Sequence, residues 1–249
     1  LHWKEVIDLA FNYPNVYAEK LEQAHPAIAA FGGAFLLMLA LEFFMNDRRE
    51  ILWLEHIEQP LKRIAKFWVP AAASLLAVAA VSVIPANHHG STTFIAGSLG
   101  IACHATITFL TRIFARTQHG SGSGKPLTGW AALSTFIYLE ILDASFSFDG
   151  VVGAFAVTNE VLLIALGLGV GALWVRSLTV FMVRKGTLND YIYLEHGAHY
   201  TVAVLAFVLL LSIFLHIPDV LAGLVGIGFI GASIAASREA RSRRPASKT

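Results

Sequence analysis

The sequence predicts an all-α protein whose helices cross a membrane about seven times. Of its 249 residues, 56% are hydrophobic and 14% are charged, and the mean hydropathy is +0.63. A soluble domain carries about 25% charged residues, because water must wet its surface. This chain has too few polar residues for that, so lipid must cover much of it. The net charge of +1 also excludes the strongly basic surface that is typical of nucleic-acid-binding proteins.

Seven segments are long and apolar enough to cross a bilayer, which takes roughly 20 mostly apolar residues per helix. They are 26–44, 67–85, 93–111, 130–157, 161–183, 198–217 and 220–236. The single cysteine, Cys103, excludes an intramolecular disulfide and any paired-cysteine zinc or redox motif. We therefore expect a multi-pass helix bundle that forms one transmembrane domain over residues 1–249.

Positive charge alternates between the connecting loops. Lys and Arg occur in the loops 45–66, 112–129 and 184–197 and in the tail from residue 237. The intervening loops at 86–92, 158–160 and 218–219 contain neither residue. Because cytoplasmic loops are enriched in Lys and Arg, the first set and the C-terminus should be cytoplasmic.

Composition divides the predicted domain. The stretch HGSGSGKP at 119–126 is typical of a flexible linker. It separates a first part, 1–118, from a second half, 127–236. The basic tail, 237–249, is expected to be disordered and to lie close to anionic lipid.

The loop at 48–66 contains an amphipathic pattern. Its apolar residues recur at helical spacing among basic residues, at Leu54, Ile57, Leu61 and Ile64. This pattern predicts either a helix that lies flat in the inner headgroup layer or a cytoplasmic helix that packs on the bundle.

The stretch TFIYLEILDASFSFDGVVGAFAVTNE, 135–160, carries three carboxylates in an otherwise apolar region, at Glu140, Asp143 and Asp149. Each charge near the bilayer centre costs about 2.5–3.5 kcal/mol, whereas each Leu or Ile gains about 0.3–0.6 kcal/mol. Such residues must therefore face the protein interior or water, where they mark an ion pathway or a buried pair.

Helical geometry separates the three acids. At about 100° per residue, Glu140 and Asp143 lie about 60° apart, whereas Asp149 lies about 120° from Asp143. Residues 145–150 alternate polar and aromatic side chains and end in glycine, a pattern of extended chain. We expect the helix to unwind around 144–150, as in transporters with broken helices. The alternative is a continuous helix whose serines bond to their own turn.

An arginine in the next predicted span supplies a partner for one acid. By depth, Arg176 and Glu140 lie at similar levels, about 12 and 15 Å from the inner boundary, and a guanidinium in a span needs a counter-charge. A Glu140–Arg176 pair would leave oxygen ligands for a cation, at Asp143, Ser145, Ser147 and Asp149. An all-oxygen set suits Mg²⁺, Ca²⁺ or Mn²⁺ better than zinc or copper.

The histidines allow further readings. In YLEHGAHY, His196 and His199 stand three residues apart beside Glu195, a spacing that could chelate a metal. Their place at a span boundary favours interfacial polar residues instead. Cys103 and His104 lie inside a predicted span, and we expect them to pack in the core.

Asn159 and Glu160 lie at the external end of the acidic segment. They are expected either to cap a helix or to line a vestibule that attracts cations. Both readings stay open at this point.

Taken together, these motifs resemble the TerC-like integral membrane proteins. The resemblance is carried by DASFSFDGVVGAFAVTNE (143–160), WVRSLTVFMV (174–183), YLEHGAHY (193–200) and HPAIAAFGGAFLLMLALEFF (25–44). It implies a bundle of two related halves, linked to tellurium resistance and manganese export, with an acidic–SxSxD-type motif in each half. Asp143, Ser145, Ser147 and Asp149 match the second copy of that motif.

The sequence departs from the family pattern in one respect. No first copy of the motif occurs before residue 130, where the spans carry only Glu42, at a cytoplasmic edge. The chain also begins at Leu1 rather than Met. We therefore expect that a preceding N-terminal part carries the other acidic helix.

The leading hypothesis is a transporter that exports a divalent cation, manganese by the resemblance, with no permanently bound cofactor. Its expected partners are the bilayer and the cation, with no nucleic acid, and its expected location is a bacterial inner (plasma) membrane. The alternatives are a non-transporting membrane scaffold or, with less support, an intramembrane metal-dependent or aspartyl hydrolase. Intramembrane aspartyl proteases carry their acids on two helices, whereas these acids share one segment, so we expect no enzyme.

Overall fold

The computed structural model describes residues 14–46, 51–118, 160–185, 191–215 and 219–243, together with positions 132–133, 136, 154 and 217. Every regular element among these residues is a helix, which confirms the predicted all-α class. The helices are α2 (Pro14–Phe44), α3 (Glu55–Arg63), α4 (Val69–Val83), α5 (Gly90–Gln118), α7 (Val161–Lys185), α8 (Leu194–Ser212) and α9 (Asp219–Arg243).

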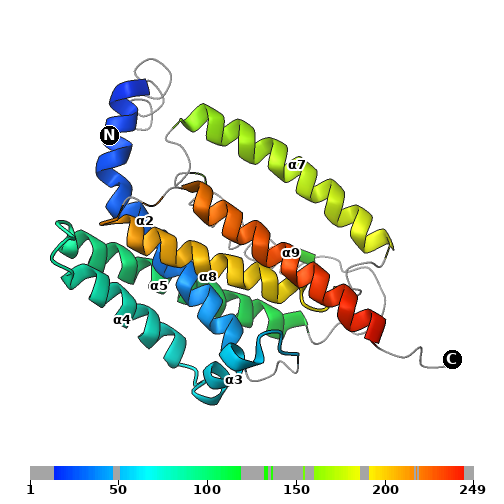
Figure 1. Cartoon of the computed structure of the whole chain (residues 1–249). Coiled ribbons are helices and arrows are strands. Elements are labelled where there is room, and N and C mark those ends of the chain that lie inside the picture. Colours follow the sequence, from blue (N-terminus) through cyan, green and yellow to red (C-terminus); the bar gives the residue numbers. More distant parts are fainter. Residues whose placement is uncertain are drawn as a thin grey trace.

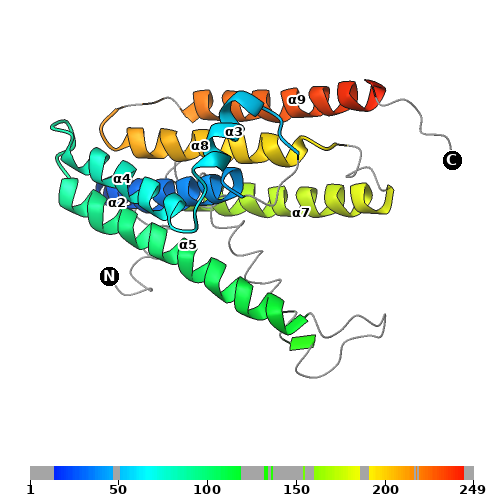
Figure 2. The ribbon, with the colours of Figure 1, turned by 90° about the horizontal axis from the view of Figure 1, so that it is seen from below.

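Helix α2 is the centre of the bundle, because it packs on α4, α5 and α8. Figure 2 shows α9, α8, α2 and α5 following one another from one side to the other, with α4 beside α2. The main core lies between α2 and α8, where Phe35 and Leu36 meet Leu209 and Leu210.

Small residues allow the helices of this core to approach closely. A Cβ atom on Gly33 of α2 would lie 2.9 Å from Leu210 Cγ of α8. A Cβ atom on Gly100 of α5 would meet the backbone oxygen of Phe31 on α2. Glycine at these positions therefore sets the spacing of α2 from both neighbours.

Within the described residues, four helices are long and apolar enough to cross a membrane, at Gln23–Phe44, Gly90–Leu110, Val161–Phe181 and Leu194–Ser212. They coincide with four of the predicted spans, so the chain is a helical integral membrane protein. Helix α4 is shorter than the predicted span 67–85, since its 15 residues extend about 22 Å at 1.5 Å each. The predicted span 130–157 lies almost entirely outside the described residues, as does the predicted linker 119–126.

Two described segments differ from expectation. Helix α9 continues to Arg243, so the tail predicted to be disordered from residue 237 is helical up to that point. The reason is a contact with another part of the chain: Ser237 is fully buried, donates to the Ser233 oxygen at 2.7 Å and accepts from the Tyr193 N–H at 3.0 Å. Helix α7 lies apart from α2, α4, α5 and α8 (Figure 1), and Ile164 is its one buried side chain among those described.

Candidate functional site

Most of the predicted cation site lies outside the described residues. This applies to Glu140, Asp143, Ser145, Ser147, Asp149 and Asn159. The broken helix, the oxygen ligand set and the Glu140–Arg176 pair therefore stay predictions.

Two residues that the sequence analysis associated with this cation site, Glu160 and Arg176, are among the described residues. The Glu160 carbonyl accepts the Ile164 N–H at 2.9 Å, so Glu160 stands at the start of α7 and closes its first turn. This backbone bond is compatible with both readings of Glu160, the helix cap and the cation vestibule, and both stay predictions. Arg176 lies inside the candidate span Val161–Phe181, and its side chain is exposed within the described structure. A guanidinium at this depth still needs a counter-charge.

The two histidines of YLEHGAHY, His196 and His199, lie in different environments. His196 is 3% exposed, and its Nε2 atom lies 3.0 Å from the Ile51 oxygen. His199 places Nδ1 2.8 Å from the Glu195 backbone oxygen and stacks its ring on Phe43, with ring centroids 3.4 Å apart. Among the residues with described positions, no group of three or more His, Cys, Asp and Glu could hold a metal ion. In the described structure both rings pack against aromatic side chains and lie within hydrogen-bonding distance of backbone oxygens, and joint chelation of a metal stays a prediction.

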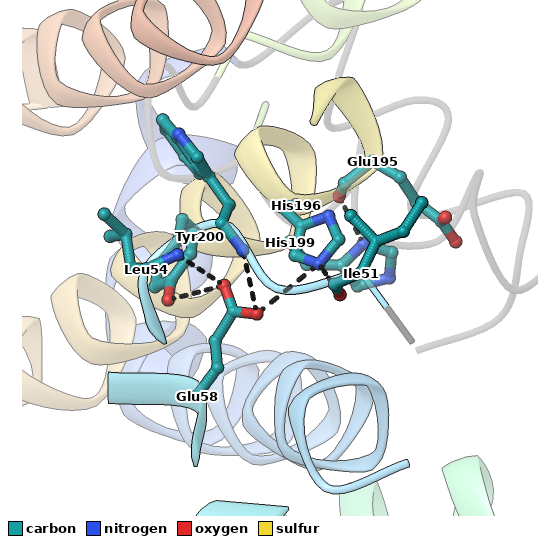
Figure 3. Close-up of polar contacts among 8 residues, drawn as sticks. Ile51, Leu54, Glu58, Glu195, His196, His199 and Tyr200 are labelled. Atoms are coloured by element: carbon teal, nitrogen blue, oxygen red, sulfur yellow. Dashed lines mark hydrogen bonds and ion pairs between the residues drawn. The ribbon is translucent and has the colours of Figure 1, made fainter. Parts of the chain in front are cut away.

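The residue that organises this region is Glu58 of α3, which the sequence analysis did not single out. It is 2% exposed, although it lies in a helix that connects two membrane segments. Its Oε1 atom accepts the Tyr200 hydroxyl at 3.1 Å and the Leu54 N–H at 3.2 Å. Its Oε2 atom accepts the Trp53 N–H at 3.3 Å and lies 3.4 Å from His196 Nε2 (Figure 3).

The local sequence explains why α3 begins where it does. The side chain of Glu58 reaches back to the N–H groups of Trp53 and Leu54, which have no carbonyl partner inside the helix. This is the same principle as a capping box, in which an acidic side chain satisfies the backbone at the helix start. The helix therefore carries its own N-terminal cap, and that cap is buried against α8.

Every neighbour of the Glu58 oxygens among the described residues is a hydrogen-bond donor or a histidine ring nitrogen, as expected around a carboxylate, which accepts hydrogen bonds. His196 Nε2 faces two acceptors, the Ile51 oxygen and Glu58 Oε2, so the geometry requires the proton on Nε2. The other ring nitrogen, Nδ1, is buried with no hydrogen-bond partner among the described atoms. We call Glu58, His196 and Tyr200 the Glu58 cluster.

A second group of ionisable residues lies between α2 and α5. His104 Nδ1 lies 3.7 Å from Glu42 Oε2, and the Thr108 hydroxyl donates to the same oxygen at 3.3 Å. His104 is 3% exposed and meets the edge of the Phe35 ring at 5.3 Å. Both Glu42 and His104 lie within candidate spans. The expected core packing holds for Cys103, which contacts the main core, whereas His104 also faces a carboxylate.

The fold and these clusters define a class: a helical integral membrane protein that keeps ionisable side chains inside its bundle. Within that class, the chain belongs to the family described as Protein of unknown function (DUF475), whose model matches residues 1–244. No curated protein and no solved structure matches the chain. The resemblance to TerC-like proteins stays a prediction.

Proposed function

We propose that the protein is a membrane transporter that exports a divalent metal cation, with manganese as the cargo that its resemblance to TerC-like proteins implies. The observation that carries the proposal is the retention of Glu140, Asp143 and Asp149 in an apolar segment of a membrane protein. Ionisable residues at membrane depth are costly and usually serve ion pathways or their counter-charges.

The described helices support this proposal in two ways. They form a bundle with several membrane-spanning helices, which a transporter requires. They also place the buried His104 ring 3.7 Å from the Glu42 carboxylate, which is about one-third exposed, between α2 and α5. A bundle that buries an imidazole beside a carboxylate can also accommodate polar groups along a cation pathway.

In the proposed mechanism, Asp143 and Asp149 bind the ion, and Ser145, Ser147 and backbone carbonyls complete an oxygen ligand set. Hard divalent cations prefer such ligands. Glu140 neutralises Arg176, so the two aspartates keep their charge for the cargo. Alternating access then moves the site from the cytoplasm to the exterior, and protons compete with the cation for the carboxylates.

The test is the manganese content of cells that express the protein. Cells with the wild-type chain should hold less manganese than cells with Asp149→Asn, because the variant loses one of two charged ligands. The matched control is Glu55→Gln, which removes an exposed carboxylate on α3 and should behave as the wild type does. Equal manganese content with wild type and Asp149→Asn would overturn the proposal.

Calorimetry separates transport from scaffolding. The purified chain should bind Mn²⁺, and Asp149→Asn should weaken this binding at least tenfold, since a charged ligand is lost. A chain that binds no Mn²⁺ but copurifies with a partner protein would favour the scaffold hypothesis instead.

A further inference from the structure

The junction of α3 and α4 presents an exposed group of apolar, aromatic and basic side chains. Phe67 is 84% exposed, Trp68 61%, Ile64 55% and Ile57 51%. The side chains of Arg63 and Lys66 are exposed beside them. We call these six residues the basic–aromatic surface.

The Glu58 cluster explains why these side chains point outward. Leu54 and Leu61 pack with Phe43, Phe44 and Tyr200, and Glu58 is bonded on the same side. Ile57 lies about 100° around the helix from Glu58, and Ile64, seven positions later, lies on the same side as Ile57. Because the buried side is fixed by hydrogen bonds and packing, rotation of α3 cannot bring Ile57 and Ile64 into the core.

The order of residues along the chain matches the layers of a bilayer. Helix α4 begins at Val69 and contains no charged residue, so it belongs in the hydrocarbon. Phe67 and Trp68 directly precede it, at the level where aromatic rings gather in membrane proteins. Lys66 and Arg63 lie one step further out, at the level of the lipid phosphates.

We propose that the basic–aromatic surface binds the headgroups of anionic phospholipids. Apolar and aromatic side chains at this depth are covered by acyl chains and the interfacial region, and two exposed cations beside them complement the charge of a phosphate-rich leaflet. Each basic side chain near such a leaflet favours anionic over neutral lipid about fivefold at low salt. The inference does not depend on ion transport, so it can fail or hold independently of the proposed function.

Trp68 provides a reporter inside the surface. The full chain is reconstituted in vesicles of phosphatidylcholine in which about one lipid in five is phosphatidylglycerol. In one sample the phosphatidylglycerol is brominated, and in the other an equal amount of the phosphatidylcholine is brominated. The fluorescence of Trp68 is obtained by difference from Trp68→Phe, because the chain has five tryptophans. We expect the brominated anionic lipid to quench Trp68 at least about twofold more than the brominated neutral lipid.

Arg63→Gln combined with Lys66→Gln should reduce this quenching ratio to about one, and high salt should reduce it in the wild type. The control combines Arg184→Gln with Lys185→Gln, an exposed basic pair at the end of α7, and should keep the wild-type ratio. The proposal is overturned by equal quenching in the wild type, which means neutral lipid covers the surface. It is also overturned if neither lipid quenches Trp68, which means a second protein copy covers it, or if the control loses the ratio as well.

Discussion

The hydroxyl of Tyr200 tests how α3 is attached to the bundle. Tyr200→Phe removes the donor that lies 3.1 Å from Glu58 Oε1 and keeps the ring, which stacks on Phe229 at a centroid distance of 5.3 Å. A hydrogen bond to a charged group contributes about 1.5–3 kcal/mol. Glu58 keeps its other neighbours, so we take the lower end, about 1.5 kcal/mol. That loss corresponds to about a tenfold increase in the open population of α3.

Hydrogen exchange on the detergent-solubilised protein measures this opening directly. The amides of Trp53 and Leu54 donate to Glu58, so both should exchange about tenfold faster in the variant. Tyr193→Phe is the matched control, because the described structure shows no hydrogen bond from the Tyr193 hydroxyl although its ring contacts Trp53 and His196. Unchanged exchange at Trp53 and Leu54 in Tyr200→Phe would show that the cluster does not hold α3.

Two further substitutions test the described packing. Gly197→Ala should push α8 away from α9 and lower the midpoint of thermal unfolding, because the added Cβ would lie 2.6 Å from Ser233 Cβ and 3.0 Å from the Phe229 oxygen. The control is Gly231→Ala, whose added Cβ would have no atom within 4 Å. This control should leave the midpoint unchanged or raise it. Glu42→Gln should lower the midpoint measured by circular dichroism in detergent by about 2–4 °C, since it replaces the carboxylate oxygen that accepts the Thr108 hydroxyl at 3.3 Å and lies 3.7 Å from His104 Nδ1. The control Glu55→Gln should not change the midpoint. Equal midpoints in Gly197→Ala and Gly231→Ala would contradict the close packing of α8 on α9. Equal midpoints in Glu42→Gln and Glu55→Gln would contradict a stabilising role of the Glu42 contacts.

The membrane helices follow from composition because hydropathy is a local property. The predicted spans 26–44 and 161–183 agree closely with the candidate spans Gln23–Phe44 and Val161–Phe181. Helix ends depend on contacts with other elements, and these are harder to predict. Helix α9 continues past residue 236 because Ser237 is buried and bonded to the backbone of Tyr193, a contact between residues 44 positions apart.

The Glu58 cluster was missed for a related reason. Glu58 lies in EHIEQPLKR, a stretch whose charges suggest a solvated surface, and its partner Tyr200 is 142 positions away. One signal in the sequence could have indicated it: Glu58 falls four residues after Leu54 and three before Leu61, inside the apolar stripe of the helix. In YLEHGAHY the spacing of His196 and His199 suggested a chelating pair. The contact with α3 instead uses His196 and Tyr200, which lie one turn apart on one side of α8.

The two readings of the loop at 48–66 each describe one side of the same helix. Leu54 and Leu61 pack on the bundle, as a cytoplasmic loop helix would. Ile57 and Ile64 are exposed, as on a helix that lies at a lipid surface. The four apolar residues of this helix face two partners, the bundle and the lipid surface, so they cover a wider part of the helix than one buried face needs. The sequence pattern therefore fitted both readings. Because Glu58 fixes the orientation of α3, the side that faces the bundle also determines which residues are presented to the membrane.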